Sequence, residues 1–442
     1  MLANAPHLVS LRRFIVPCKS WGEALFYGAG LKMYDVLAMG RGTPRSSLMG
    51  SKQVLAEQPG IRASAVRGGV AYYDGQFDDA RFALSLAQTC AREGGTLLNY
   101  CEVESLIKDA GRVVGVRARD VEGDEVIEVE ADCVINATGV FVDAIRRMDK
   151  PGSTDLVQAS QGIHVVLDRS FLPGDSAVMV PKTDDGRVLF AIPWRNHVLL
   201  GTTDTPTETI DQEPAPLENE VEYLLEHAAR YLERPPSASD VTSVFVGLRP
   251  LIGAKGGPTK SIPREHCIEV SESGLLTVTG GKWTTYRMMA QEVVDQAFGV
   301  IGKSRKACVT SDMKLHAWEA FDPSKEQPDF AEYGTERQAL QQTIADETEG
   351  ELPLHPDLPY VMGQVVWAIR SEMARTVEDV LARRTRALFL NARASVESAP
   401  AVAALLGREL GRDYQWQSAQ VDAFSTLAEQ YQVLSTPQCE HT

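Results

Sequence analysis

Cysteine pairs of the CxxC type are absent from the 442-residue sequence, whose seven cysteines are scattered and odd in number. This spacing argues against a zinc site and a disulfide framework, so we expect free thiols in a reducing compartment and no bound metal. A run of about 20 uninterrupted apolar residues, the length that spans a bilayer, is also absent. Nor does the N-terminus show the basic, apolar and small-residue order of a signal peptide. We therefore predict a cytoplasmic protein that contacts the inner face of a membrane at most peripherally.

Positive charge is in the minority, with 44 Lys and Arg against 60 Asp and Glu, a net charge of −16. Because a nucleic-acid backbone needs a basic surface, we expect no nucleic-acid partner. Apolar residues make up 44% of the chain, enough to bury a large core, and the length predicts two or three domains.

Residues 5–40 mix apolar and basic positions. Four apolar side chains recur at helical spacing with arginines between them: Leu8, Leu11, Phe14 and Ile15. The pattern predicts an amphipathic helix. Such a helix either packs on its own domain or lies against lipid headgroups.

The segment 78–139 alternates helix and strand. We predict a helix over 78–95 that Asp78 or Asp79 caps and the Gly94-Gly95 pair ends. A strand over 96–102 and a hairpin follow, and then an apolar strand over 133–139, typical of a parallel sheet covered on both faces. This order predicts the closing section of a dinucleotide-binding α/β unit.

Short strand patterns dominate residues 153–280. They read "GIHVVLD", "SAVMVP", "RVLFAIPW", "HVLLGTT", "VFVGLRPL", "HCIEV" and "LLTVTGG". We predict a mostly antiparallel sheet with a helix near 217–233, a returning helix over 284–300 and a helical C-terminal part.

Six motifs together resemble one family: "CVINATGVFVDAI", "SQGIHVVLD", "IPWRNHVLLGTTDT", "VGLRPLI", "VTGGKWTTYR" and "RTVEDVLARRTRALFL". In this order, over about residues 5–430, they look like the FAD-dependent glycerol-3-phosphate dehydrogenases. The resemblance implies an α/β fold with three parts. These are an incomplete glutathione-reductase-like FAD-binding domain (1–150 with 276–305), an antiparallel-sheet substrate domain (151–275) and a helical C-terminal domain (306–442).

The sequence departs from that family in its glycine fingerprint. The G-x-G-x-x-G motif has its nearest match at Gly28-Ala29-Gly30, but Met33 holds the third glycine's place and no buried strand precedes it. We therefore expect the chain to begin after the family's first section. Weak FAD retention and exposed apolar sheet edges would follow.

The implied reaction is oxidation of sn-glycerol 3-phosphate to dihydroxyacetone phosphate by hydride transfer to FAD, with a quinone accepting the electrons. The resemblance also implies a peripheral membrane contact and a homodimer. Two alternatives stay open: a related FAD-dependent amino- or hydroxy-acid oxidase, and an inactive truncated or split-subunit flavoprotein fragment.

Gly280 and Gly281 end the strand "LLTVTGG". Without a Cβ, their backbone could approach the edge of a flat ring, and in this family that ring is the flavin. A helix that begins near Thr284, with Thr284 and Thr285 as caps, would aim its positive end at the ring. The alternative is an ordinary strand-turn-helix.

Arg249 and Lys282 are the candidates for binding the substrate's phosphate, since arginine offers a planar fork and lysine a compact charge. His164 is the candidate base for the C2 hydroxyl, because histidine titrates near neutral pH. The alternatives are a structural ion pair for Arg249, an exposed loop lysine, and a hydrogen-bonded core histidine.

The resemblance adds four cofactor contacts: Val103 beside the adenine, and Ala137, Thr138 and Gly139 near the pyrophosphate or the ribityl chain. In the C-terminal part, Thr376 and Asp379 have the spacing of a capping box. The arginines that follow predict a solvated helix face, with a docking site as the alternative.

Overall fold

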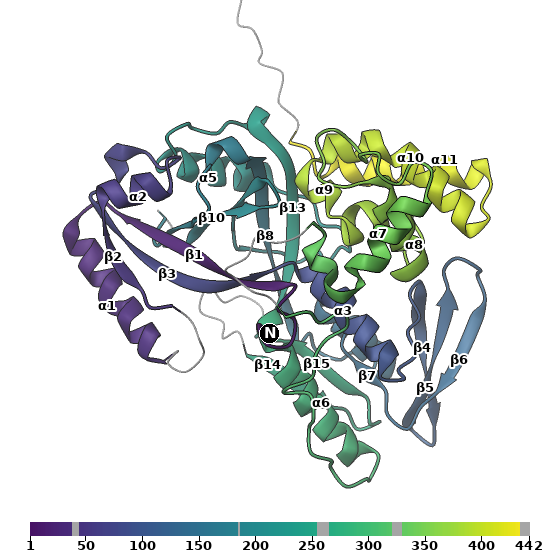
Figure 1. Cartoon of the computed structure of the whole chain (residues 1–442). Coiled ribbons are helices and arrows are strands. Elements are labelled where there is room, and N and C mark those ends of the chain that lie inside the picture. The colour runs from purple at the N-terminus through teal and green to yellow at the C-terminus, as the bar shows by residue number, and fades with distance from the viewer. Residues whose placement is uncertain (38–43, 184–185, 254–264, 321–328, 434–442) are drawn as a thin grey trace, which may run out of the picture.

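The computed structural model describes residues 1–37, 44–183, 186–253, 265–320 and 329–433. A large twisted sheet forms one side of the molecule, and the C-terminal helices pack against its end (Figure 1). Two small sheets and helix α6 lie on the opposite side from the sheet's outer edge. The predicted α/β class with an antiparallel second sheet and a helical C-terminal part is confirmed.

The large sheet has nine strands in the order β12-β8-β11-β10-β9-β1-β3-β2, with β13 also paired to β8. Its strands are β1 (Val9–Cys18), β2 (Ser47–Gly50), β3 (Gly68–Phe77), β8 (Val157–Asp168), β9 (Ala177–Val180), β10 (Leu189–Trp194), β11 (His197–Gly201), β12 (Thr205–Pro206) and β13 (Val241–Ile252). All pairs are antiparallel except β1 with β9. The strands predicted between 162 and 251 are therefore confirmed.

The amphipathic helix predicted around residues 8–15 is wrong, because this segment is strand β1. The consecutive residues from Phe14 to Cys18 are all buried. A strand covered on both faces gives such a continuous apolar run, whereas a surface helix does not. The helix of this region is α1 (Trp21–Leu37), which follows at the outer edge of the sheet (Figure 1).

The main core fills the space between one face of the large sheet and two helices, α2 (Ser51–Glu57) and α5 (Glu218–Ala229). Helix α5 contributes Val221, Leu224, Leu225 and Ala228, spaced as one apolar face of a helix. This confirms the helix predicted near 217–233. It also fixes the first turn of α5 beneath the strands of the candidate site.

Two three-stranded sheets complete the β structure: β14-β15-β7 and β4-β5-β6. Their strands are β4 (Cys101–Asp109), β5 (Arg112–Asp120), β6 (Val126–Glu130), β7 (Ile135–Asn136), β14 (His266–Val270) and β15 (Leu276–Gly280). Strand β7 runs parallel to β15. The sheet β4-β5-β6 contains the predicted hairpin, because β4 pairs antiparallel with β5.

Two predictions for this parallel section need correction. Residues 96–100 are not in a strand, and the predicted strand over 133–139 shortens to β7, which pairs with β15 alone among the described residues. Leu98 and Ile135 are 63% and 42% exposed. The apolar strand is therefore not covered on both of its faces, although the apolar pattern predicted such cover. The expected exposed sheet edge is thus present.

Three helices flank the small sheets: α3 (Asp79–Arg92), α4 (Val142–Asp149) and α6 (Tyr286–Val300). Asp78 caps α3 by accepting a hydrogen bond from the Arg81 backbone nitrogen at 3.1 Å. Gly94, with φ +91°, follows its end. Both predicted signals for this helix are confirmed.

The C-terminal part is helical, as predicted. It contains α7 (Arg337–Asp346), α8 (Met362–Ser371), a π-helical turn (Asp379–Arg384), α9 (Ala387–Leu390), α10 (Ala392–Leu410) and α11 (Tyr414–Glu429). All of these elements except α7 share a core of their own, to which Phe245 of β13 adds a side chain, and α7 packs in a smaller cluster with Trp367 of α8. That contact ties the helical part to the large sheet.

The predicted capping box at Thr376 and Asp379 is confirmed: the Asp379 backbone nitrogen donates to Thr376 Oγ1 at 3.1 Å, and the Thr376 nitrogen donates to Asp379 Oδ2 at 3.3 Å. The predicted solvated face is wrong. Asp379 is buried and also accepts a bond from Tyr100 Oη at 2.8 Å, so the motif lies at a junction between parts of the chain.

A second buried contact crosses the same junction. Arg81 of α3 and Glu372, which follows α8, form an ion pair of 2.7 Å with both side chains inaccessible to solvent. Trp367 Nε1 donates to the same carboxylate at 3.1 Å. The helical part and the helix α3 are therefore joined by buried charge as well as by apolar packing.

The sheet topology corrects one predicted domain boundary. Strands β1, β2 and β3 belong to the large sheet, so these three strands lie with β8 to β13 and not with the dinucleotide-binding section. Among the described residues, the helices are all too short or too polar to cross a bilayer.

Candidate functional site

Strands β8 and β13 place a set of chemically matched side chains on one face. Their register pairs Phe245 with His164, Gly247 with Gly162, and Arg249 with Ser160. Side chains two residues apart lie on the same face of a strand. The histidine, the arginine and two glycines therefore share one face of the sheet.

The Arg249 guanidinium lies directly over Gly162. A Cβ on this glycine would stand 2.3 Å from Nη2 of Arg249, so only glycine leaves room for the group. Arg249 Nη2 donates to Thr202 Oγ1 at 3.3 Å, and Nη1 lies 3.5 Å from Asp204 Oδ1. The arginine thus reaches back to the loop that follows β11. The predicted structural ion pair is present, although the side chain stays 25% exposed.

His164 is held between an aromatic ring and backbone. Its ring stacks on Phe245 with centroids 5.2 Å apart, and a Cβ on Gly201 would come within 2.6 Å of Nε2. Burial and, to a smaller extent, the positive charge of Arg249 together lower the His164 pKa to about 4. The imidazole is therefore neutral at pH 7 and able to accept a proton.

Gly247 lies between Phe245 and Arg249 on the shared face of β13. A Cβ at Gly162 or Gly201 would clash with a neighbouring side chain, whereas a Cβ at the exposed Gly247 would meet no atom of the described residues within 4 Å. Gly247 thus leaves open space on the sheet between a cation and a neutral imidazole. That combination suits an anionic molecule which also carries a hydroxyl group.

The Ala-Thr-Gly turn follows β7 and is cross-linked to β15. Asn136 Nδ2 donates to Thr277 Oγ1 at 3.3 Å, and Thr279 Oγ1 donates to the Gly139 carbonyl at 2.9 Å. Thr138 Oγ1 donates to Asn136 Oδ1 at 2.8 Å. The turn and the last residues of β15 therefore lie side by side, as the predicted site requires.

Gly280 and Gly281 have φ of +79° and +75°, a conformation that favours glycine. The atoms closest to these two glycines belong to other residues of this chain. A Cβ on Gly280 would meet the Glu265 carbonyl at 2.7 Å and Ile252 at 2.8 Å, and a Cβ on Gly281 would meet Met289 at 2.6 Å. The missing side chains are thus explained by internal packing. Ile252 also brings this turn to the end of the strand that carries Arg249.

The predicted helix start at Thr284 is shifted. Helix α6 begins at Tyr286, after a short 3-10 turn over Trp283–Thr285. Thr285 Oγ1 donates to the Lys282 carbonyl at 2.9 Å and does not cap α6. Lys282 and Thr284 are exposed at this turn. Thr285 therefore stabilises the turn itself, and the predicted capping of α6 is wrong.

Beside the Ala-Thr-Gly turn lies a pocket of about 740 Å³. Its wall includes Val140, Phe141, Val157, Gln158, Pro206 and Ile210. A Cβ on Gly139, with φ +62°, would meet nothing within 4 Å. Val103, the predicted adenine contact, lies at a bulge where β4 pairs with β5. The turn thus has open space beside its backbone.

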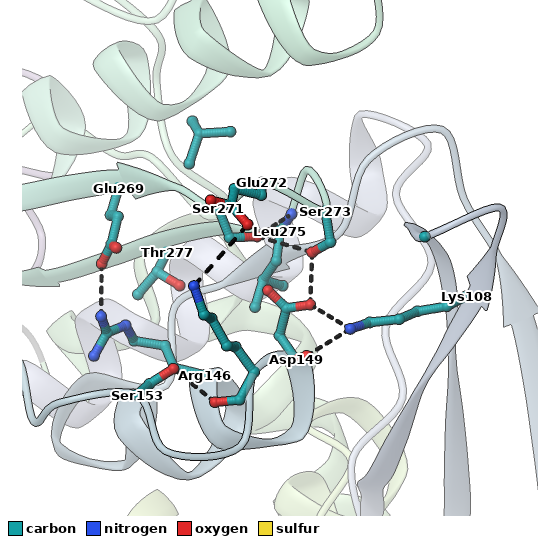
Figure 2. A pocket seen from close by; sticks show the side chains of 13 residues that line it. Lys108, Arg146, Asp149, Ser153, Glu269, Ser271, Glu272, Ser273, Leu275 and Thr277 are labelled. Atoms are coloured by element: carbon teal, nitrogen blue, oxygen red, sulfur yellow. Dashed lines mark hydrogen bonds and ion pairs between the residues drawn. The ribbon is translucent and has the colours of Figure 1, made fainter.

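A second pocket lies at the opposite end of β15, and Figure 2 shows that its charges pair with one another. Lys108 Nζ lies 2.8 Å from Asp149 Oδ1, and Arg146 Nη2 lies 2.9 Å from Glu269 Oε2. Ser273 Oγ also donates to Asp149, at 2.6 Å. This pocket has no net charge to offer an ion, and it begins near Leu275 and not near the glycine turn.

Sequence reasoning missed one acidic residue of the site and gave another no chemical role. Asp204 lies in the family motif "IPWRNHVLLGTTDT", which served only for the resemblance. Glu220 lies in the first turn of α5, where an acidic residue is ordinary on a solvated helix. Its burial beneath the site depends on tertiary packing and left no signal in the sequence.

Two families match the chain. Residues 5–287 match the family of FAD dependent oxidoreductases, and residues 276–419 match the C-terminal domain of alpha-glycerophosphate oxidase. The mitochondrial glycerol-3-phosphate dehydrogenase of Bos taurus is 35% identical over 93% of this chain. That of Saccharomyces cerevisiae is 31% identical over 94% of the chain. The chain spans 60% of the length of the bovine relative and 76% of the yeast relative.

Among solved structures, the glycerol-3-phosphate dehydrogenase from Bacillus halodurans, complexed with FAD, superposes with a TM-score of 0.80. It is 27% identical, and the match covers 98% of this chain and 85% of that one. The family matches, the relatives and the shared fold agree with the resemblance drawn from the six motifs. The chain belongs to the FAD-dependent oxidoreductase family, in its glycerol-3-phosphate dehydrogenase branch.

Proposed function

We propose that the chain oxidises sn-glycerol 3-phosphate to dihydroxyacetone phosphate with FAD as cofactor. The observation that carries this proposal is the shared face of β8 and β13, on which the open space at Gly247 lies between Arg249 and the neutral imidazole of His164. The names of the relatives and the glycerophosphate-oxidase type C-terminal match supply the substrate.

The residues present fit a flavin on one side. The open space at Gly139 and the pocket beside it would receive part of the cofactor, which Ala137, Thr138 and Gly139 would contact through their backbone. Gly280 and Gly281 would hold their backbone at its edge, and Val103 is the proposed adenine contact. Bound FAD supplies a hydride acceptor for the substrate's C2 carbon.

The protein's own residues have distinct roles in this scheme. Arg249 binds the substrate's phosphate with its planar fork, and Lys282 adds a second charge from the turn after β15. Asp204 shares the arginine with the phosphate and limits its movement. His164 accepts the proton of the C2 hydroxyl at Nε2, which requires the neutral form that its low pKa maintains.

The test compares Arg249→Lys with the parent chain after addition of FAD. The lysine keeps the charge but loses the fork, so we expect kcat/KM for glycerol 3-phosphate to fall about 100-fold, the effect of roughly 3 kcal/mol of charged hydrogen bonding. Dihydroxyacetone phosphate is the product to measure. Turnover of amino acids with hydrogen peroxide as product would instead favour the oxidase alternative.

A quinone as electron acceptor, a homodimer and a peripheral membrane contact are further parts of the proposal. Helix α1 supports the membrane contact, because its outward side chains are more than half exposed and apolar: Trp21, Leu25, Phe26, Met33, Val36 and Leu37. Two exposed lysines, Lys19 and Lys32, lie at the beginning and in the middle of this surface. The ammonium groups of both lysines would pair with the phosphates of lipid headgroups.

Flotation with anionic vesicles tests this contact. The double substitution Phe26→Ser and Leu37→Ser should abolish flotation, because it removes two large apolar groups from the proposed contact surface. Leu98→Ser is the control, since Leu98 is also more than half exposed but lies in the segment before β4, outside α1. Equal loss in both variants would count against α1.

A further inference from the structure

Glu220 is a buried carboxylate at the start of α5, only 3% exposed. In the described part of the chain, its partners are neutral donors. Oε1 accepts from Thr203 Oγ1 at 2.8 Å and from Thr205 Oγ1 at 2.6 Å. Oε2 accepts from Gln161 Nε2 at 2.6 Å and from the Leu217 nitrogen at 3.4 Å. A buried charge so fully hydrogen-bonded is costly to alter.

The two threonines bound by Glu220 alternate with the two residues that contact Arg249. Thr202 accepts a hydrogen bond from the guanidinium, Asp204 forms its ion pair, and Thr203 and Thr205 are their chain neighbours. Ser160, opposite Arg249 on β8, also donates to Asp204. The segment from Thr202 to Thr205 is thus held by Glu220 from beneath and contacts Arg249 above.

The hydroxyl group of Thr203 both accepts and donates a hydrogen bond. Its Oγ1 accepts from the Ile163 backbone nitrogen at 3.0 Å, so its own hydrogen is the one that bonds to Glu220. Both oxygens of Glu220 accept from at least two donors. A glutamine at this position would turn its NH₂ group either toward two N–H donors, or toward the two threonine hydroxyls, which would then have to accept hydrogen bonds that they now donate.

We propose that Glu220 is a positioning residue for the anion site: it fixes Thr203 and Thr205 so that Thr202 and Asp204 hold the Arg249 guanidinium over Gly162. That a fixed Arg249 raises the affinity for the substrate rests on the proposed function. That Glu220 fixes the position of the Arg249 guanidinium does not.

The first experiment needs neither cofactor nor substrate. Phenylglyoxal modifies arginine side chains, and peptide mass spectrometry gives its rate at Arg249. We expect Glu220→Gln to raise that rate several-fold, because the guanidinium loses its fixed partners. Glu222→Gln is the matched control: it makes the same charge change two residues away on the exposed side of α5 and should leave the rate unchanged.

Two threonine variants separate positioning from general destabilisation. Thr203→Val removes the hydroxyl and should act like Glu220→Gln, whereas Thr203→Ser keeps the hydroxyl and should restore the parent rate. The midpoint of thermal unfolding, measured for all variants, shows whether the fold is retained. A parent-like modification rate at Arg249 in folded Glu220→Gln would overturn the proposal.

The second experiment measures kinetics with added FAD. Glu220→Gln should raise KM for glycerol 3-phosphate about tenfold, the effect of about 1.4 kcal/mol, with kcat little changed. Turnover of glycerol, which has no phosphate, should not change. If the parent chain does not oxidise glycerol 3-phosphate, the proposed function fails while the modification result still decides the role of Glu220. Equal KM effects on both substrates would contradict positioning through Arg249.

Discussion

The two sheets that meet at the candidate site differ in how completely the described residues support them. Strand β8 has neighbours on both sides, in β11 and β13, and its inward side chains are buried in the main core. Strand β7 has only two residues and pairs with β15 alone within the described ranges. The strands that carry His164 and Arg249 are therefore well supported by neighbouring strands. The turn proposed to contact the cofactor follows a strand with little support.

Hydrogen exchange gives the largest expected contrast between the two sheets. Amides of β8 and β13 should exchange about 100-fold more slowly than those of β7 and β15, a difference of roughly 2.7 kcal/mol in opening free energy. Mass spectrometry of peptides from each strand measures this. Equal protection would mean that further contacts stabilise β7 and β15, and would contradict the predicted difference in stability between the two sheets.

Adding FAD sharpens the same measurement. If the proposed contacts form, protection should rise in β15 and in residues 137–139, with β8 little changed. Protection that rises in β8 alone would contradict the proposed cofactor side.

Glycine substitutions test the anion side next. Gly162→Ala places a Cβ 2.3 Å from Arg249 Nη2, so the guanidinium must move. We expect kcat/KM for glycerol 3-phosphate to fall more than about tenfold and stability to fall by about 1–3 kcal/mol. Gly247→Ala is the control, because nothing lies within 4 Å of its added Cβ. Gly247→Ala should leave the free energy of unfolding within about 0.5 kcal/mol of the parent. An increase in KM without a loss of stability would indicate that the substrate occupies the open space at Gly247.

The sequence predicted the large sheet better than the small one. Strands such as "GIHVVLD" alternate or run apolar between turn residues, and their partners lie in the same chain, so local pattern and tertiary pairing agree. The apolar residues 133–137 predicted a doubly covered strand, but cover on both sides comes from neighbouring strands, which a local pattern cannot supply.

The site residues divide in the same way. His164 and Arg249 could be selected because their motifs resemble a family, and the register then brought them to one face. Glu220 could not be selected, because a glutamate in a first helical turn is typical of an exposed helix end. At Gly280 the sequence indicated a close approach but could not say whose atoms approach, and the structure shows Glu265 and Ile252.

A pH titration tests the burial of His164. Its folded pKa of about 4 lies below the ordinary value of 6.5, because burial and Arg249 disfavour the charged ring. The unfolded chain therefore binds more protons between these values, and this histidine should cost about 2 kcal/mol of stability as pH falls from 7 to 5. Denaturant unfolding of His164→Asn should show a smaller loss over this range. An identical pH dependence in both proteins would mean that His164 titrates normally.

The smallest expected effect comes from the turn on the small sheet. Gly139→Ala imposes a side chain at φ +62° in open space, so only backbone strain of about 1 kcal/mol should appear. Gly30→Ala, in α1 with nothing near its added Cβ, should instead stabilise by about 0.5–1 kcal/mol. Thermal unfolding of the two variants measures the difference. A large loss in Gly139→Ala would show that this turn is more constrained than its surroundings suggest.

The ion pair between Arg81 and Glu372 has a consequence for engineering the chain. Cutting the polypeptide before residue 372 would remove the counter-charge of the Arg81 guanidinium, at a cost of about 3–5 kcal/mol wherever the remaining chain keeps that side chain buried. The C-terminal helices cannot then be treated as a detachable module. Any shortened or chimeric version would need an apolar side chain in place of Arg81 before the remainder could keep its shape.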